Sequence, residues 1–145
     1  MMKIEDIFTQ WKEDSDIDRT ELGDEVLKIP KLHHKYYQMF IGERLLLRQY
    51  DAEMKQLKLD KYEFYTQGPN EETKEKGWVM PAKGLILKSD IPMYMEADRD
   101  IVKLSLKIGI QNEKIDFIES IIKSLVNRGF NIKAAIDWQK FTMGA

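Results

Sequence analysis

The chain has 145 residues, 43% hydrophobic and 33% charged, and a formal net charge of −2. This length suits a single domain, residues 1–145, with its own core. The absence of cysteine excludes disulfides, thiol catalysis and cysteine-based metal sites. The near balance of charge means that any anion-binding surface has to be local.

Charge is distributed unevenly along the sequence. Residues 1–27 carry 3 basic and 9 acidic side chains, whereas residues 28–61 carry 8 basic and 4 acidic ones. Residues 62–145 hold 12 of each sign. The pattern predicts an acidic head, a basic helical rod and a balanced remainder. The first residues lack the apolar stretch of a signal peptide, and no run approaches the roughly 18 apolar residues of a membrane span.

The acidic head, residues 1–29, is predicted to hold two short helices. Four apolar residues share the face of a first amphipathic helix: Ile4, Ile7, Phe8 and Trp11. Asp18 suits the N-cap of a second helix over roughly 19–29. We expect Pro30 to end that helix, because a proline disfavours helical geometry in the residue before it.

Residues 30–66 are predicted to form one long basic helix. An apolar seam recurs there at steps of three, four and seven: Leu32, Tyr36, Met39, Leu46, Tyr50, Met54, Leu57 and Phe64. The steps of seven skip Glu43 and Lys61, so the seam resembles a coiled coil with polar interruptions. A helix of this length needs a partner helix or another copy of the chain to cover its seam.

Residues 67–96 are predicted to be a solvated loop followed by a small β insertion. The stretches GLILK and PMYME are short, apolar and flanked by turn residues. Pro81 and Pro92 argue against a central position in a sheet.

Residues 97–145 are predicted to be C-terminal assembly helices, starting near Asp98 or Asp100 and interrupted at Gly129. Seven residues line the main stripe: Ile101, Leu104, Ile108, Ile115, Ile118, Ile122 and Leu125. Ile110, Ile121 and Val126 fall off it, which predicts a second neighbour, interpreted as another subunit. The residues predicted to mediate this oligomerisation are Ile115, Ile118, Ile121, Ile122, Leu125, Phe130, Ile136 and Phe141. Overall we expect a mainly α fold of two long antiparallel helices, a small β insertion and short terminal helices.

Catalytic and cofactor motifs are scarce in the sequence. His33 and His34 are adjacent, so on a helix they point about 100° apart and cannot easily share a metal. No glycine-rich phosphate loop or nucleophile elbow is present. We therefore expect no enzyme activity, no metal and no cofactor.

The end of the basic helix combines cations with aromatic rings. The residues that this face could use to bind a single DNA strand are Arg44, Arg48, Lys55, Lys58, Lys61, Tyr62 and Tyr65. A row of cations can follow phosphates, and stacking on an aromatic ring contributes about 1–3 kcal/mol per base. The same pattern also fits a lysine-rich solvated face whose aromatic residues belong to the core.

Four segments occur in order along the chain: KIEDIFTQWKEDSDIDRTEL, DKYEFYTQG, EADRDIVKLSLKIG and SLVNRGFNIKAAIDWQKF. In this order and spacing they resemble the UvsY family of recombination mediators of T4-type phages, particularly its cyanophage-like members. The resemblance covers nearly the whole chain. Within it, the family's pair of basic residues before the aromatic run falls on Leu59 and Lys61, with Lys58 adjacent. The transfer of a DNA contact is therefore direct for Lys61 and indirect for Lys58.

The resemblance implies a helical protein without enzyme activity that forms a ring-like homo-oligomer, taken to be a heptamer. It implies binding to single-stranded DNA, to a phage recombinase and to the phage single-strand-binding protein, in the cytoplasm of the infected bacterial host. Such a mediator would promote loading of the recombinase onto DNA that the binding protein covers. The alternative is a coiled-coil adaptor that bridges proteins without binding DNA. A hydrolase or nuclease would need a metal cluster that the sequence does not supply.

Overall fold

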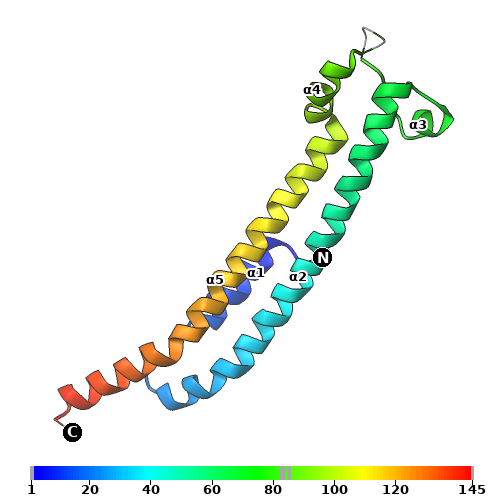
Figure 1. Ribbon diagram of the computed structural model, residues 1–145. Helices are drawn as coiled ribbons and strands as arrows, with labels where there is room; N and C mark the ends of the chain where they lie inside the picture. The colour runs from blue at the N-terminus through cyan, green and yellow to red at the C-terminus, as the bar shows by residue number, and fades with distance from the viewer. Residues whose placement is uncertain (1, 82–83, 85, 145) are drawn as a thin grey trace. The chain divides into compact units, whose positions relative to one another are not determined.

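The structure is a computed structural model that describes residues 2–81, 84 and 86–144. In chain order its elements are α1 Ile4–Asp14, α2 Leu22–Gln67, α3 Glu71–Glu75, the 3-10 helix η1 Lys88–Asp90, α4 Ile91–Glu96 and α5 Arg99–Thr142 (Figure 1). The fold is mainly helical, as predicted, and no strand occurs in the ranges that the structure describes.

Contacts divide the chain into two units. The terminal unit comprises the residues up to Leu45 and those from Asn112 onward, and the central unit comprises Leu46–Gln111. The long helices α2 and α5 each contribute one segment to each unit.

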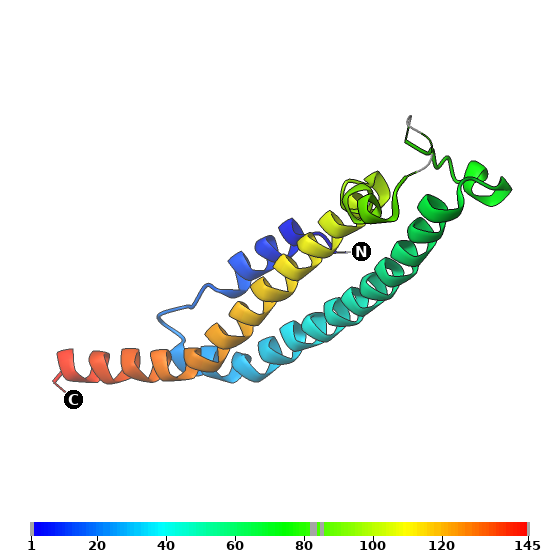
Figure 2. The same ribbon diagram turned by 45° about the horizontal axis from the view of Figure 1, so that its top comes forward.

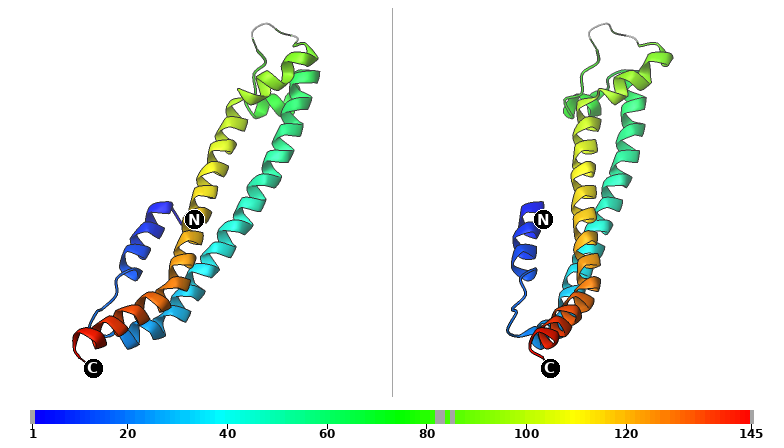
Figure 3. Two further views of the ribbon diagram at one scale, coloured as in Figure 1. Left: turned by 60° about the vertical axis from the view of Figure 1, so that its left-hand side comes forward. Right: turned by 90° about the vertical axis from the view of Figure 1, so that its left-hand side faces the viewer.

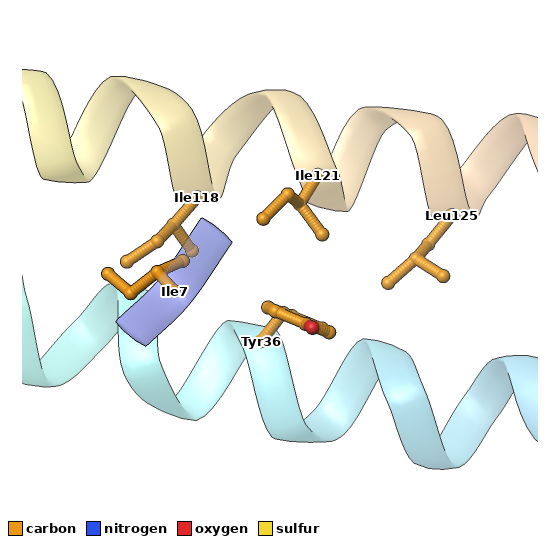
Figure 4. Packing of buried hydrophobic residues seen from close by; sticks show 5 residues of the cluster. All are labelled: Ile7, Tyr36, Ile118, Ile121 and Leu125. Atoms are coloured by element: carbon orange, nitrogen blue, oxygen red, sulfur yellow. The ribbon is translucent and has the colours of Figure 1, made fainter. Parts of the chain in front are cut away.

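The terminal unit has an apolar core at the meeting point of α1, α2 and α5. Its most buried side chains gather there (Figure 4): Ile7, Tyr36, Ile118, Ile121 and Leu125. The helix α1 lies alongside α5, as Figures 1 and 3 show from different directions. Burial of the Ile7 face of α1 explains why an 11-residue helix is stable in this position.

Polar contacts hold α1 in the terminal unit. The Asp14 carboxylate at the end of α1 accepts hydrogen bonds from Lys35 Nζ at 2.6 Å and from the Tyr36 hydroxyl at 2.7 Å. Arg128 donates to the Asp14 carbonyl oxygen at 2.9 Å. Lys114 of α5 pairs with Glu43 of α2 at 3.0 Å, with both side chains largely buried. These pairings show that α2 and α5 run antiparallel within this unit.

The central unit is built on the C-terminal part of α2 and the N-terminal part of α5. Phe64, Tyr65 and Ile91 form its buried cluster, and Trp78 packs against them. Figure 2 shows α3 beside the end of α2 and α4 at the start of α5. The helix α2 ends at Gln67 because Gly68 adopts a φ of 84°, which is left-handed geometry, and Pro69 follows.

The prediction that Pro30 ends a helix is wrong, because α2 runs through it. A proline in a helix interior removes one hydrogen bond and costs about 3 kcal/mol. Packing on both sides of Pro30 offsets this loss. Ile29 approaches Gly129 of α5, and Leu32 and Tyr36 join the apolar core.

The predicted helix stop at Gly129 is also wrong, because α5 continues to Thr142. A side chain at position 129 would meet the tip of Ile29 at 3.9 Å, so the glycine lies where α2 comes close. Arg128 and Ile132 on either side of it are buried, at 5% and 2% exposed, and they keep this part of the helix packed.

The predicted β insertion is not observed. PMYME lies in α4, and Lys88 of GLILK lies in η1, while Leu85 falls outside the described residues. Pro92 is compatible with helix because it sits in the first turn of α4, where its missing N–H would have no helical acceptor. The loop predicted over 67–77 also contains α3, which Asn70 and Thr73 cap reciprocally.

Candidate nucleic-acid interface

Three cations and one aromatic ring lie on an exposed face of α2 in the central unit. Arg48, Lys55 and Lys58 are all exposed, and none of them forms an ion pair with any residue that the structure describes. Helical spacing places them and Tyr62 on one side of α2, away from the buried Tyr50 and Phe64. Tyr62 is 46% exposed. This surface, Arg48–Lys55–Lys58–Tyr62, is called the cationic strip below.

The end of the cationic strip borders an open apolar hollow. Lys58 and Tyr62 line it from α2, Pro92 and Met95 from α4, and Val102 and Leu106 from α5, around a volume of about 460 Å³. A cation and an aromatic ring at the rim, beside an apolar floor, suit a chain of alternating phosphates and flat bases.

Lys61 is not part of this strip, which corrects its expected place on the exposed face. Its side chain is 5% exposed, and its ammonium pairs with Asp98 at 3.1 Å and with Asp100 at 2.8 Å. The same ammonium lies 3.9 Å from the centre of the Trp78 ring. Lys61 falls on the seam of α2, so its charge turns toward α5 and away from solvent.

Tyr65 is also buried, and its hydroxyl donates to Asp98 at 2.6 Å. Burial by itself would raise the pKa of Asp98, but hydrogen bonds from Tyr65, the Ile101 amide and Lys61 outweigh it and hold that pKa below 3.8. Burial, followed by the bond to Asp98, raises the pKa of the Tyr65 phenol well above its ordinary value. Asp98 therefore carries a negative charge and Tyr65 stays neutral at physiological pH.

Arg44 belongs to the terminal unit, where it is exposed and its guanidinium lies 5.4 Å from the centre of the Phe40 ring. A second group of exposed cations, which sequence reasoning missed, lies on α5 in the central unit: Arg99, Lys103 and Lys107. Their i, i+4, i+8 spacing was the available signal. Lys107 lies 4.4 Å from the centre of the Tyr50 ring.

The residues predicted to mediate oligomerisation separate into two groups. Ile115, Ile118, Ile121 and Leu125 are at most 8% exposed within a single chain. The second neighbour inferred for Ile121 is α1 of the same chain, which supplies Ile7. Ile122 and Ile136 are half-buried.

By contrast, Phe130 and Phe141 are 74% and 75% exposed. Trp138, which sequence reasoning missed, is 65% exposed and stacks on Phe141 with ring centres 5.7 Å apart. Helical spacing puts all three aromatic side chains on one side of α5. Phe130, Trp138 and Phe141 are called the aromatic face below.

Within residues 2–81, 84 and 86–144, no group of three or more histidine, aspartate or glutamate side chains could hold a metal ion. None of the helices in these ranges combines the length and apolarity needed to cross a bilayer.

The sequence is similar to one known family of proteins. The model of the family described as "Recombination, repair and ssDNA binding protein UvsY" matches residues 10–145. The recombination protein uvsY of Enterobacteria phage T4 is 23% identical over 144 residues, which cover 99% of each chain.

Crystal structures of the bacteriophage T4 recombination mediator protein UvsY have the same fold. One matches with a TM-score of 0.79 and 23% identity, covering 99% of each chain. A second matches with a TM-score of 0.78 and 20% identity, covering 97% of this chain and 99% of the other.

Proposed function

The chain belongs to the UvsY family of recombination, repair and single-stranded-DNA-binding proteins, and from this premise we propose that the cationic strip of its central unit is the surface that holds the strand. As a recombination mediator of the UvsY type, it would promote loading of a strand-exchange recombinase onto DNA covered by single-strand-binding protein. We expect it to act in the cytoplasm of the infected bacterial host.

One observation carries the proposal. Arg48, Lys55 and Lys58 are exposed and form no ion pair with a described residue, whereas neighbouring Lys61 is buried and paired. Unpaired cations can neutralise phosphates without first breaking an ion pair. Each phosphate neutralised on a single strand contributes about 0.7 to the slope of log affinity against log salt. One copy offers only a few such contacts, so affinity depends on several copies acting together.

The test is fluorescence anisotropy with a labelled oligonucleotide at several salt concentrations. Lys55→Glu with Lys58→Glu should weaken binding and lower the salt slope by at least about 1.4, the value for two lost phosphate contacts. The matched control is Lys12→Glu with Lys133→Glu, because both lysines are exposed, lie in the terminal unit and give the same change in net charge. If both variants weaken binding equally, affinity depends on the net charge of the chain and not on the cationic strip.

We also propose that the aromatic face is covered by a second copy of the chain. Three large aromatic side chains, each at least 65% exposed on one side of α5, form the kind of patch that marks an interaction surface. Of the oligomerisation residues, Phe130 and Phe141 are the most exposed, and Trp138 lies beside Phe141. The ring of seven copies implied by the resemblance would repeat the cationic strip.

Light scattering tests this assembly. Replacement of Phe130, Trp138 and Phe141 by serine should lower the solution mass and, through lost avidity, the DNA affinity. The control replaces three other exposed apolar residues, Leu27, Val79 and Leu87, by serine. A full-mass assembly from the aromatic variant would contradict the assignment of this face. A wild-type chain that assembles but ignores oligonucleotides would favour the adaptor function.

A further inference from the structure

Lys61 is one of two charged residues, with Glu43, that interrupt the apolar seam of α2. The flanking seam residues Leu57 and Phe64 are partly or fully buried, and Lys61 is buried between them. A buried ammonium is stable only when opposite charges and hydrogen bonds satisfy it. Asp98, Asp100 and the Trp78 ring provide this at 3.1, 2.8 and 3.9 Å. Its ammonium is therefore already occupied within the chain.

Asp98 connects this ammonium to the start of α5. One carboxylate oxygen accepts from the backbone amides of Asp100 and Ile101 at 2.9 and 3.1 Å, which is the geometry of an N-cap. The other oxygen accepts the Tyr65 hydroxyl at 2.6 Å and contacts Lys61. The carboxylate thus links the first turn of α5 to two residues of α2, one turn apart.

Such a link fixes the register of the two helices in the central unit. A shift of α5 by one turn would place Lys61 opposite an apolar residue and leave Asp98 without its partner. A single polar residue in an apolar seam specifies register in this way in coiled coils. The register in turn determines which α5 residues, Val102 and Leu106, face Lys58 and Tyr62 across the hollow.

We infer that Lys61 is a positioning residue for DNA binding: it holds α2 in register with α5 through Asp98, while Lys58, one turn earlier, and Tyr62, the next residue, contact the strand. This inference rests on the proposed function of the cationic strip. It reassigns the residue on which the sequence resemblance would place a direct phosphate contact.

A charge-neutral exchange separates the two roles. In Lys61→Met with Asp98→Asn, methionine keeps most of the lysine volume, and asparagine can still cap α5 through its carbonyl oxygen while its amide donates to the Tyr65 hydroxyl oxygen. Lys61→Met alone leaves two carboxylates together and should weaken oligonucleotide binding at least tenfold. The double variant should recover affinity to within about threefold of wild type and keep the wild-type salt slope.

The charge-matched control is Lys58→Met with Asp98→Asn, which should bind weakly and lose about 0.7 of the salt slope. If the Lys61 double variant stays weak with a slope reduced in the same way, Lys61 contacts phosphate and the inference is wrong. Failure of the wild-type chain to bind any oligonucleotide would instead overturn the proposed function, which makes the two failures distinguishable.

Lysine acetylation of the wild-type chain, followed by mass spectrometry, gives a second test that needs no folded variant. Without DNA, Lys61 should react much more slowly than Lys55 and Lys58. With an oligonucleotide, Lys55 and Lys58 should become protected while the rate at Lys61 stays unchanged. Rapid acetylation of Lys61 that DNA suppresses would overturn the inference.

Discussion

The terminal and central units each contain one buried ion pair where the apolar seam of α2 is interrupted, and they differ in what surrounds it. Glu43 pairs with Lys114 in the terminal unit, which also has an apolar core with five side chains at most 1% exposed. Lys61 pairs with Asp98 in the central unit, where Leu57, Leu104 and Ile108 along the same helices are only half-buried.

The difference shows that the two units depend on different interactions. Apolar burial stabilises the terminal unit, and its ion pair adds to a core that is already closed. In the central unit, the charged network of Lys61, Tyr65, Asp98 and Trp78 adjoins a smaller buried cluster built on Phe64 and Ile91. We therefore expect removal of charge to affect the central unit most, and removal of methyl groups to affect the terminal unit most.

The largest effect is expected from Lys61→Met. Breaking a buried pair by removing one partner costs about 3–5 kcal/mol, because the remaining charge stays buried. Here two carboxylates, Asp98 and Asp100, lose their common cation. Lys114→Met, which leaves one carboxylate, should reduce stability less. Amide hydrogen exchange of residues 46–111 measures the loss of stability in Lys61→Met. An equal or larger loss of stability in Lys114→Met would contradict the difference between the two units.

The next largest effect is expected in the terminal unit, from loss of apolar side chains. Ile118→Ala removes a side chain that is 0% exposed and should cost about 2–5 kcal/mol, including the cavity that it leaves. Leu104→Ala in the central unit should cost about 1–2 kcal/mol, because that side chain is only half-buried. Chemical denaturation of both variants measures the difference, and similar losses would show that the two interiors are equally apolar.

The smallest effect is expected on the stability of the fold at low pH. Burial opposes ionisation of Asp98 and of Asp14, yet hydrogen bonds and cations hold the pKa of both below 3.8. A lowered pKa gives stability that is complete above the unfolded-state value, about 3.9, and is lost as pH falls through the folded-state value. Asp98→Asn and Asp14→Asn should each flatten the decrease in unfolding free energy below about pH 4. If the unfolding free energy of these variants fell below pH 4 as steeply as that of the wild type, these charge assignments would be wrong.

The sequence predicted the helical class and most of the interior. Every residue of the α2 seam, from Leu32 to Phe64, is buried or half-buried. The steps of seven skip Glu43 and Lys61, which were predicted only as polar interruptions; in the structure both residues form interior ion pairs. The identity of those partners needed the antiparallel register of α5, which no local pattern contains.

The remaining differences have one physical cause, which is tertiary packing that outweighs local preference. The sequence pattern predicted helix ends at Pro30 and Gly129, but α2 and α5 approach each other there, with Ile29 beside Gly129, and both helices continue. Ile121 was assigned to contacts between subunits because sequence periodicity could not place α1 on that side of α5. Lys61 was predicted to lie on the exposed face because Lys55 and Lys58 precede it at steps of three.

Photocrosslinking to an oligonucleotide that carries 5-bromouracil tests most directly whether the central unit holds the strand. We predict that crosslinks map to the segment containing Lys55, Lys58 and Tyr62, and that they fall in proportion when Lys55 and Lys58 are changed to glutamate. Crosslinks confined to the terminal unit, or crosslinks unaffected by that change, would contradict it.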